Sequence, residues 1–515
     1  MKRLLLPVLV LLGALALVAA APAKDKDEGF KTTQPPMVRG VAPGVTAQPI
    51  ITVGDTLENG YRFESIPDGI SFRKHGQDAR VWINHETSTV PFPFTPATGA
   101  GFNDFTNAML SELTLNGRNG GGVLDASYVI PSEANYQRFC SNFLVGEEHG
   151  FDRKLLFTNE EATDFVNRTG TAWPAGPGAE QAGVVVAYDI QSGAYKSIYG
   201  MGRHNHENSV AMPGYGHPVV LSGDDTFTSN PAQSQLYSYI APDATAVWND
   251  TGDLYGFVSD NPAVNDYYDF PIGSSMSVSG KFVKIPKAAA VGDQTALETA
   301  SDALNVFQFV RLEDIAYDKR PGMGNVAYVA DTGRGVSTDA TNTFASSNGR
   351  IWKLVLDPAD PAKVLSLSIL IEGDDNPVKT LDEIHQPDNV ETTESGLLVT
   401  EDPGSSQQFT WNSTEANATT ARMWRYDFGS GTKAVMTRVD QSADEGPTDT
   451  DPSTTPGNQG AWESTGILDV SKVFGPDMFL LNVQAGTLII QREVRGLLVY
   501  EREGGQLLLV HIPGA

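Results

Sequence analysis

Cysteine is nearly absent from the sequence: Cys140 is the only one in 515 residues. A single thiol excludes an internal disulfide framework, so the fold depends on its core and on any bound metal. We interpret Cys140 itself as a small buried hydrophobic residue.

Basic residues are also scarce, with 36 Lys and Arg against 63 Asp and Glu and a net charge of −27. This balance makes nucleic acid a poor partner. The excess of acidic residues keeps the protein soluble, and it also supplies carboxylate oxygens that can bind hard cations.

Long apolar runs are confined to the first residues of the chain. Lys2 and Arg3 precede an apolar stretch from Leu4 to Ala19, and small residues follow it. This pattern predicts a signal peptide over residues 1–21, and the alternative is a retained membrane anchor. We therefore expect a secreted or periplasmic protein with no membrane contact after cleavage.

Helical periodicity is also hard to find. Short runs rich in Val, Ile, Leu, Tyr and Phe, such as 184–188 and 351–356, recur between clusters of Gly, Pro, Asn and Asp, which predicts an all-β fold. No repeat of fixed length is evident. A β-propeller of six, or seven, degenerate blades with long loop insertions suits one large domain, and a pair of β-sandwiches is the alternative. Residues 22–54 are predicted as an extended N-terminal arm, and residues 55–515 as a single catalytic propeller that stays monomeric.

Acidic, amide and imidazole side chains gather at the ends of the predicted strands. Such side chains supply the oxygens and nitrogens that metals bind. Taken singly, each carboxylate is better explained as a turn residue or a solvated face. Loops from different blades of a propeller converge on one mouth, however, so together these residues predict a metal site. The candidate ligands are His85, Glu86, Asn159, Glu160, Glu161, His206, Glu207, Glu313, Asp314, His385, Asp388, Asn389, Glu401 and Asp402.

Two arginines lie within these segments, Arg203 and Arg311. An arginine beside carboxylates ordinarily forms an ion pair. Beside metal ions its planar donors match two phosphoryl oxygens, so both are candidate catalytic residues, with Arg311 first. The sequence contains no Gly-x-Ser-x-Gly elbow, no phosphate-binding Gly-rich loop and no His-Glu-x-x-His, which argues against the corresponding enzyme classes.

The order of the motifs resembles the PhoX family of secreted alkaline phosphatases. The motifs are Asn84-His85-Glu86, Glu160-Glu161, Gly202-Arg203, His206-Glu207, Arg311-x-Glu313-Asp314, Pro387-Asp388-Asn389 and Glu401-Asp402. The resemblance implies a six-bladed propeller with a calcium and iron cluster that hydrolyses phosphomonoesters. It implies that Glu161, Glu207 and Glu313 bind metal and that Arg311 contacts phosphate.

One position departs from the family pattern. Family members carry a cysteine, an iron ligand, directly before the paired glutamates, and this chain has Asn159 there. We therefore expect calcium together with a transition metal that is manganese or iron, since oxygen-preferring ions suit these ligands better.

We predict a secreted, metal-dependent phosphomonoesterase that uses a multi-metal cluster and a metal-activated water on a small phosphate ester. Two alternatives stay open. One is a phosphotriesterase or lactonase-like esterase on the same metallo-propeller, and substrate charge separates it from a monoesterase. The other is a non-catalytic secreted binding propeller stabilised by calcium.

Overall fold

The computed structural model describes residues 28–87, 107–229, 231–334, 348–374, 382–402, 419–441, 462–486, 488, 490–494, 497–501 and 504–515. The predicted signal peptide lies outside these residues. Within them, the few helices are too short or too polar to cross a membrane.

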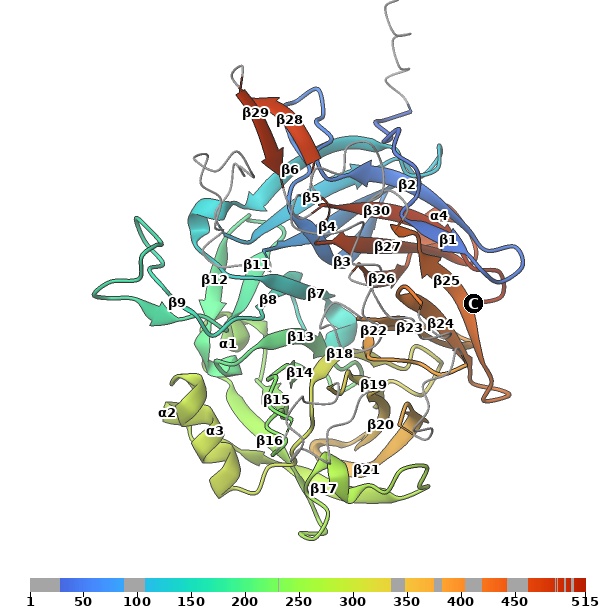
Figure 1. Ribbon diagram of the computed structural model, residues 1–515. Helices are drawn as coiled ribbons and strands as arrows, with labels where there is room; N and C mark the ends of the chain where they lie inside the picture. Colours follow the sequence, from blue (N-terminus) through green and yellow to red (C-terminus); the bar gives the residue numbers. More distant parts are fainter. Residues whose placement is uncertain are drawn as a thin grey trace, which may run out of the picture.

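Antiparallel strands form nearly all of the regular structure, which confirms the prediction of an all-β propeller (Figure 1). Each innermost strand contacts the next one around a central axis, and the last contacts the first, so the ring is closed. The innermost strands are β3 (Ile66–His75), β7 (Phe139–Val145), β13 (His206–Ala211), β18 (Leu312–Tyr317), β22 (Pro387–Thr392) and β26 (Glu463–Asp469).

Each innermost strand opens a four-stranded meander that runs outward from the axis. β3 leads to β4 (Asp78–Glu86), β5 (Met109–Leu115) and β6 (Val123–Ile130). β7 leads to β8 (Leu155–Glu160), β11 (Val185–Asp189) and β12 (Tyr195–Ile198). β13 leads to β14 (Val219–Asp224), β15 (Leu236–Ile240) and β16 (Asp253–Ser259). β18 leads to β19 (Val326–Asp331), β20 (Arg350–Asp357) and β21 (Asp360–Glu372). β22 leads to β23 (Gly396–Glu401), β24 (Arg422–Asp427) and β25 (Lys433–Val439).

The last meander is completed by the N-terminal part of the chain. β26 pairs with β27 (Met478–Ala485), β27 with β30 (Gly504–His511), and β30 with β2 (Thr46–Thr52). β1 (Val38–Gly40) adds an outer strand to β25. Both N-terminal strands fall in residues 22–54, so the segment predicted as an extended arm is built into the sheets.

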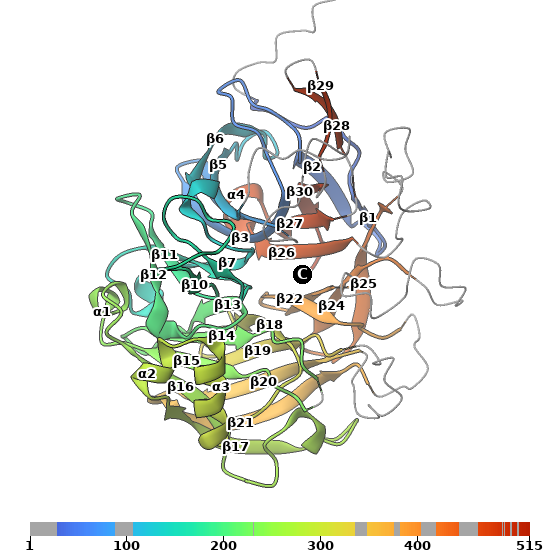
Figure 2. The same ribbon diagram turned by 60° about the vertical axis from the view of Figure 1, so that its left-hand side comes forward.

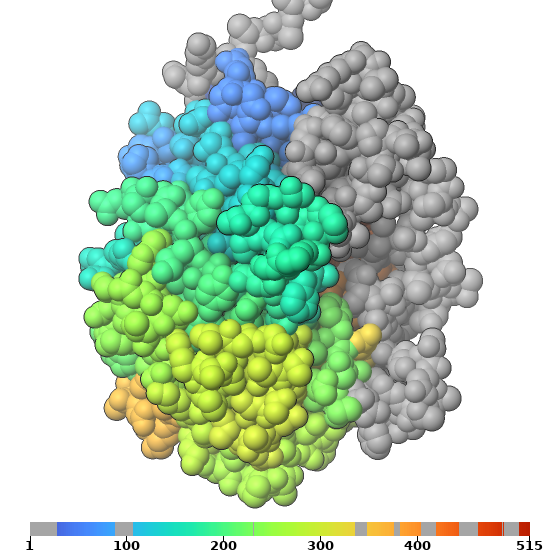
Figure 3. All heavy atoms as spheres, turned by 90° about the vertical axis from the view of Figure 1, so that its left-hand side faces the viewer, coloured from blue at the N-terminus to red at the C-terminus, as the bar shows by residue number. Residues whose placement is uncertain are grey.

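The remaining elements are insertions between these strands. β17 (Ser277–Lys284) joins two meanders by pairing with β16 and β21. The helices α2 (Lys287–Ala290) and α3 (Gln294–Ala303) form part of the outer surface, in yellow in Figure 3. Figure 2 shows them beside β15 and β16, away from the axis. The other insertions are α1 (Ala244–Trp248), α4 (Ser471–Phe474), the hairpin β9 (Phe165–Val166) and β10 (Glu180–Gln181), and the hairpin β28 (Ile490–Val494) and β29 (Leu497–Glu501).

The hydrophobic core lies between successive meanders. One buried cluster, for example, joins Trp82 of β4 to Phe139 and Leu156 of the next meander. A strand between two neighbours is buried on both faces, as all of Leu155–Glu160 is. Such strands read as continuous apolar runs without alternation. This explains why the sequence shows short apolar runs and little period-two pattern.

A β-bulge interrupts every innermost strand close to its start. Two residues of the inner strand leave the regular pairing at each bulge, which re-aims their side chains. These pairs are Asp68-Gly69, Cys140-Ser141, Glu207-Asn208, Glu313-Asp314, Asp388-Asn389 and Gly466-Ile467. The same bulge therefore recurs in each of these strands, although the residues that form it differ from one strand to the next.

Candidate metal centre

The bulges bring side chains from distant parts of the chain together at the axis. Three groups could each hold a metal ion, because one ligand atom per residue lies within 4.8 Å of the others in its group. The groups are Asp68, Glu86 and Cys140; Cys140, Glu161 and Glu207; and Glu207, Glu313 and Asp388. We call these seven residues the central cluster. Because Cys140 and Glu207 are shared, the groups form one continuous row.

The sixth bulge contributes no side chain to this row. Its first residue is Gly466, and a Cβ there would lie 2.4 Å from the carbonyl oxygen of Asp68. The φ of Gly466 is +61°, a left-handed conformation that also favours glycine. The backbones of the first and last innermost strands therefore approach too closely for any other residue.

In two of the meanders, the second strand ends in a pair of adjacent acids. One acid of each pair binds the surrounding protein and the other faces the site. Successive side chains of a strand point to opposite faces. Glu161 faces the central cluster, whereas Glu160 accepts hydrogen bonds from Gln137 N at 2.7 Å and Val184 N at 3.1 Å. Glu160 also receives both Nη atoms of Arg168, at 2.6 and 2.8 Å. Glu160 was a predicted ligand, but its oxygens are engaged with the protein.

The same division recurs at Glu401 and Asp402. Glu401 accepts hydrogen bonds from His385 N at 2.9 Å, Arg422 N at 3.0 Å and Trp424 Nε1 at 2.9 Å. Asp402 instead reaches Arg311, with Oδ2 3.4 Å from Nη1. The first acid of each pair thus fixes the loop that leads into its own innermost strand, and the second faces the site. His385, another predicted ligand, belongs to the Glu401 network through Nδ1, 3.2 Å from Arg422 Nη2.

Both ring nitrogens of His85 and of His206, two predicted ligands, are hydrogen-bonded to other groups of the protein. His85 Nδ1 donates to Glu64 O at 2.5 Å, and its Nε2 accepts from Ser111 Oγ at 2.6 Å. His206 Nε2 lies 3.1 Å from Gly202 O and its Nδ1 lies 2.8 Å from Ser222 Oγ. Burial lowers the pKa of both imidazoles to about 4. Each ring is therefore neutral, and its one lone pair is already used.

A ring of hydrogen bonds joins the blades directly beside the cluster. Two predicted ligands, Asp314 and Asn389, take part in it, and a third, Asn159, bonds to it from within its own blade. Asp314 accepts from Val390 N at 2.9 Å and from Asn208 Nδ2, and Asn389 Oδ1 accepts from Gly466 N. Asn159 Nδ2 donates to Ser141 O at 2.8 Å, while its buried Oδ1 has no hydrogen-bond partner. The other links run from Asn142 Nδ2 to Gly69 O, from Ser141 Oγ to Glu207 and from Asn482 Nδ2 to Asp68 O.

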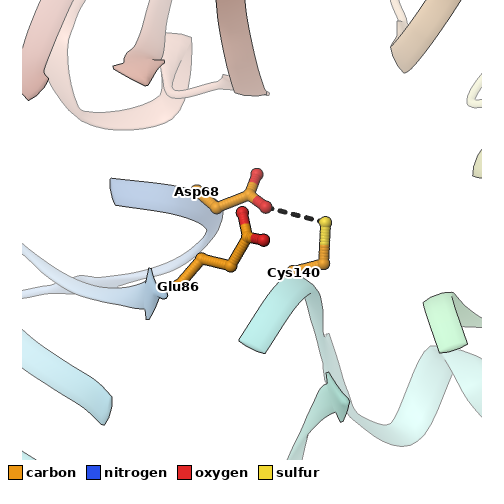
Figure 4. A group of neighbouring side chains, drawn as sticks. All are labelled: Asp68, Glu86 and Cys140. Carbon is orange, nitrogen blue, oxygen red and sulfur yellow. Dashed lines mark hydrogen bonds between the residues drawn. The ribbon is translucent and has the colours of Figure 1, made fainter. Parts of the chain in front are cut away.

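Cys140 is buried as predicted, but its surroundings are acidic rather than apolar. Its Sγ lies 2.8 Å from Asp68 Oδ2 and 3.0 Å from Glu207 Oε1. Figure 4 shows Asp68 and Glu86 turned toward the sulfur. One thiol proton cannot satisfy both carboxylates. We therefore correct the interpretation of Cys140 as a mere hydrophobic filler: it lies in two of the three candidate metal groups.

The electrostatics of the cluster call for a cation. Burial, followed by the neighbouring carboxylates Glu313, Glu161 and Asp68, raises the pKa of Glu207 well above its usual range. Burial and the same kind of repulsion raise the pKa of Cys140 as well. The buried Glu207 Oε2 has no hydrogen-bond partner. A bound cation would pair with these groups and reverse their pKa shifts, so the residues present fit a metal.

Arg311 is the cation nearest to this cluster in the described structure. Its Nε and Nη2 donate to the two carboxylate oxygens of Asp225, at 2.8 and 2.7 Å, and Nη2 also lies 2.5 Å from Glu313 Oε1. Nη1 has only the 3.4 Å contact with Asp402. Arg203, the second predicted catalytic residue, donates to Gln181 O and stacks on Tyr199, and it pairs with no acid of the described residues. The geometry therefore favours Arg311 over Arg203 for the site.

Comparison with known families identifies the family of the chain. The sequence model described as "Alkaline phosphatase PhoX" matches residues 156–451, more than half of the chain. The chain belongs to the PhoX family of alkaline phosphatases, which are phosphoesterases. No curated protein matches its sequence.

A solved structure shows the same fold as this PhoX-family chain. The structure of Pseudomonas fluorescens PhoX in complex with vanadate, a transition state analogue, aligns with a TM-score of 0.58 at 14% identity and covers 94% of this chain and 98% of that one. An α-L-arabinofuranosidase from Fusarium graminearum, in complex with an iminosugar inhibitor, gives a TM-score of 0.40 at 9% identity over 90% of this chain and 97% of that one. A likeness as low as the second indicates nothing about activity.

Two members of the central cluster, Asp68 and Cys140, were not among the ligands predicted from the sequence. Three of the bulges share a readable pattern, an acid followed by Asn or Asp, in Glu207-Asn208, Glu313-Asp314 and Asp388-Asn389. Asp68-Gly69 is a near match to it. Cys140-Ser141 carries no such signal, because the acids that contact its sulfur, Asp68 and Glu207, come from other blades.

A cavity of about 740 Å³ follows the axis on the other side of the bulges. All six innermost strands contribute to its lining, which begins at the second bulge residues such as Asn208, Asp314 and Asn389. None of the seven central-cluster residues lines this cavity. The central cluster and this axial cavity therefore lie on opposite sides of the hydrogen-bond ring.

Proposed function

We propose that this chain is an exported, metal-dependent phosphomonoesterase whose central cluster holds more than one metal ion. The observation that supports this most directly is the row of three ligand groups that share Cys140 and Glu207. Sharing of ligands is typical of sites that hold neighbouring ions. Family membership supports a catalytic role over the binding-only alternative.

The donor set suggests which ions these groups would take. Asp68, Glu86, Glu161 and Glu207 would join Cys140 in holding a transition metal, since a thiolate suits iron better than it suits calcium. The third group, Glu207, Glu313 and Asp388, has only oxygen donors, which calcium prefers. Asn159 at the position of the family cysteine favours an oxygen-preferring ion, whereas Cys140 in the cluster supplies a sulfur donor that suits iron.

The protein's own residues would position the phosphoryl group. When bound, such ions supply positive charge for the phosphoryl oxygens and make a water acidic enough to act as a nucleophile. Asp225 fixes the plane of Arg311 through two hydrogen bonds, which leaves Nη1 as the donor for a phosphoryl oxygen. A site this charged suits the dianion of a monoester better than an uncharged triester or lactone.

Chelation with a matched substrate pair tests the proposal. We expect 4-nitrophenyl phosphate to be hydrolysed much faster than a dialkyl 4-nitrophenyl triester. Activity should be lost on removal of metal by EDTA, verified by elemental analysis, and return when calcium and iron or manganese are restored. Full activity in protein shown to be free of metal would refute the metal-dependent mechanism, and a preference for the triester would favour the phosphotriesterase alternative.

A further inference from the structure

An exposed aromatic ring lies at the rim of this charged site. Phe227 follows β14 two residues after Asp225, and 42% of it is exposed. Its ring lies over Arg311, with the guanidinium carbon 4.4 Å from the ring centroid. A single exposed Phe is ordinary on a protein surface. This one, however, stacks on the guanidinium that would hold the phosphoryl group.

The loop that carries Phe227 is tied down on both sides of the ring. Before it, Thr226 Oγ1 donates to Asp224 Oδ1 at 2.9 Å and accepts from Gln294 Nε2 at 2.7 Å. After it, Ser229 O accepts a hydrogen bond from Tyr268 Oη at 2.7 Å. The position of the ring is therefore set before any ligand arrives, which lowers the entropic cost of a contact with it.

A second guanidinium approaches the same ring from the neighbouring blade. Arg334 follows β19, the second strand of its meander, and its guanidinium carbon lies 5.9 Å from the Phe227 centroid. Arg334 forms no ion pair with the described residues. Since Phe227 follows the second strand β14, both side chains come from the loops at the same mouth. The result is a ring flanked by two cations, with part of its surface open to solvent.

We propose that Phe227 contacts the leaving group and favours phosphomonoesters whose leaving group carries a planar aromatic ring. This rests on the proposed phosphatase function. With a phosphoryl oxygen on Arg311 Nη1, the group attached through the ester oxygen would extend next to a ring that is 4.4 Å from that same guanidinium. Stacking on a fixed aromatic side chain does not depend on hydrogen bonds, so the preference is for aromatic shape rather than for one particular base.

Adenosine 5′-phosphate and ribose 5-phosphate provide a matched test, because they share the phosphorylated ribose and the nucleotide carries an aromatic base where the sugar phosphate has a hydroxyl group. Phosphate release would be measured for the wild type and for Phe227→Ala, Phe227→Leu and Phe227→Tyr, with metal content checked for each. The wild type should prefer the nucleotide roughly tenfold in kcat/KM, the scale of one stacking contact. Phe227→Ala and Phe227→Leu should remove most of this preference, and Phe227→Tyr should keep it. Phe165→Ala removes another exposed Phe, one on the β9 hairpin, and should change neither value.

The outcomes separate this inference from the function on which it rests. An equal fall for both substrates would show that Phe227 acts only through Arg311, and an unchanged preference would show that it does not meet the leaving group; either result overturns the inference and leaves the phosphatase function standing. Hydrolysis of neither ester by the metal-loaded wild type would overturn both.

Discussion

The adjacent acids Glu160 and Glu161 allow the structural and the functional role of a carboxylate to be separated at the end of one strand. Glu160→Gln keeps the shape of the side chain but removes the charge that faces Arg168, which is buried except for 16% of its side chain. Removing one partner of a buried ion pair costs about 3–5 kcal/mol. Arg168 keeps a second partner, Glu180, at 2.7 Å, so we expect a loss near the lower end, about 3 kcal/mol.

This loss should appear in the melting temperature and not in the chemistry. With an unfolding entropy of roughly 2 cal/mol/K per residue, a chain of this length would melt about 3 °C lower. Metal content and kcat/KM of the folded Glu160→Gln protein should stay close to those of the wild type, because the Glu160 oxygens bind Gln137, Val184 and Arg168 rather than the cluster.

Glu161→Gln should show the opposite pattern. Burial, followed by repulsion from Asp225 and Glu86, raises the pKa of Glu161 well above its usual range. Removing this charge relieves repulsion in the metal-free protein, so its melting temperature in EDTA should not fall. Bound metal and kcat/KM should fall, by at least on the order of 100-fold for kcat/KM.

Thermal melts with and without EDTA, elemental analysis and phosphatase kinetics on the two variants check this prediction. The reasoning is refuted if the two variants behave alike. It is also refuted if Glu160→Gln loses metal while Glu161→Gln keeps both metal and activity.

Three further predictions concern the candidate metal centre and Arg311 beside it. Arg311→Lys keeps the charge but loses the planar fork, so kcat/KM should fall by on the order of 10²- to 10³-fold at unchanged metal content; wild-type turnover would remove Arg311 from the site. Cys140→Ser should lower the content of transition metal, since the thiolate is lost, and a variant with wild-type metal and activity would contradict our placement of this ligand. In EDTA the melting temperature should fall as the pH rises above about 4, the ordinary pKa of a carboxyl group. Burial raises the pKa of Asp68 to about 6 and those of Glu161 and Glu207 higher, so the folded state retains protons that the unfolded state has released. That stability is lost as the pH rises through the folded pKa values. Saturating metal should flatten the profile, and a flat profile in EDTA would count against the mutual repulsion of these acids.

The sequence was sufficient for the all-β class, and its ordered motifs pointed to a propeller and to acids at one mouth. It could not separate Glu160 from Glu161, because the distinction lies in the direction that each side chain takes at the end of β8 and in partners such as Val184. The hydrogen bonds that engage His85 likewise depend on a loop residue, Glu64, from another part of the same blade.

Cys140 shows why a local sequence pattern was not enough. Its acidic neighbours Asp68 and Glu207 are 72 and 67 positions away along the chain. Nothing in the residues adjacent to Cys140 predicts that they will meet. The bulge that directs its Sγ to the axis is likewise invisible, because the same backbone geometry is formed by Asp-Gly, Glu-Asn and Cys-Ser.

The pairing of β2 with β30 also fixes the order in which the site can form. Thr46 of β2 lies opposite His511 of β30, so this blade cannot be completed until nearly the whole chain is available. Closing so long a loop is slow compared with forming the meanders within the chain. Asp68 lies beside the junction between the first and last innermost strands, where Asn482 binds its carbonyl oxygen. We therefore expect the complete set of candidate ligands to come into register only after the two ends of the chain have met, so that metal binding would follow folding rather than nucleate it.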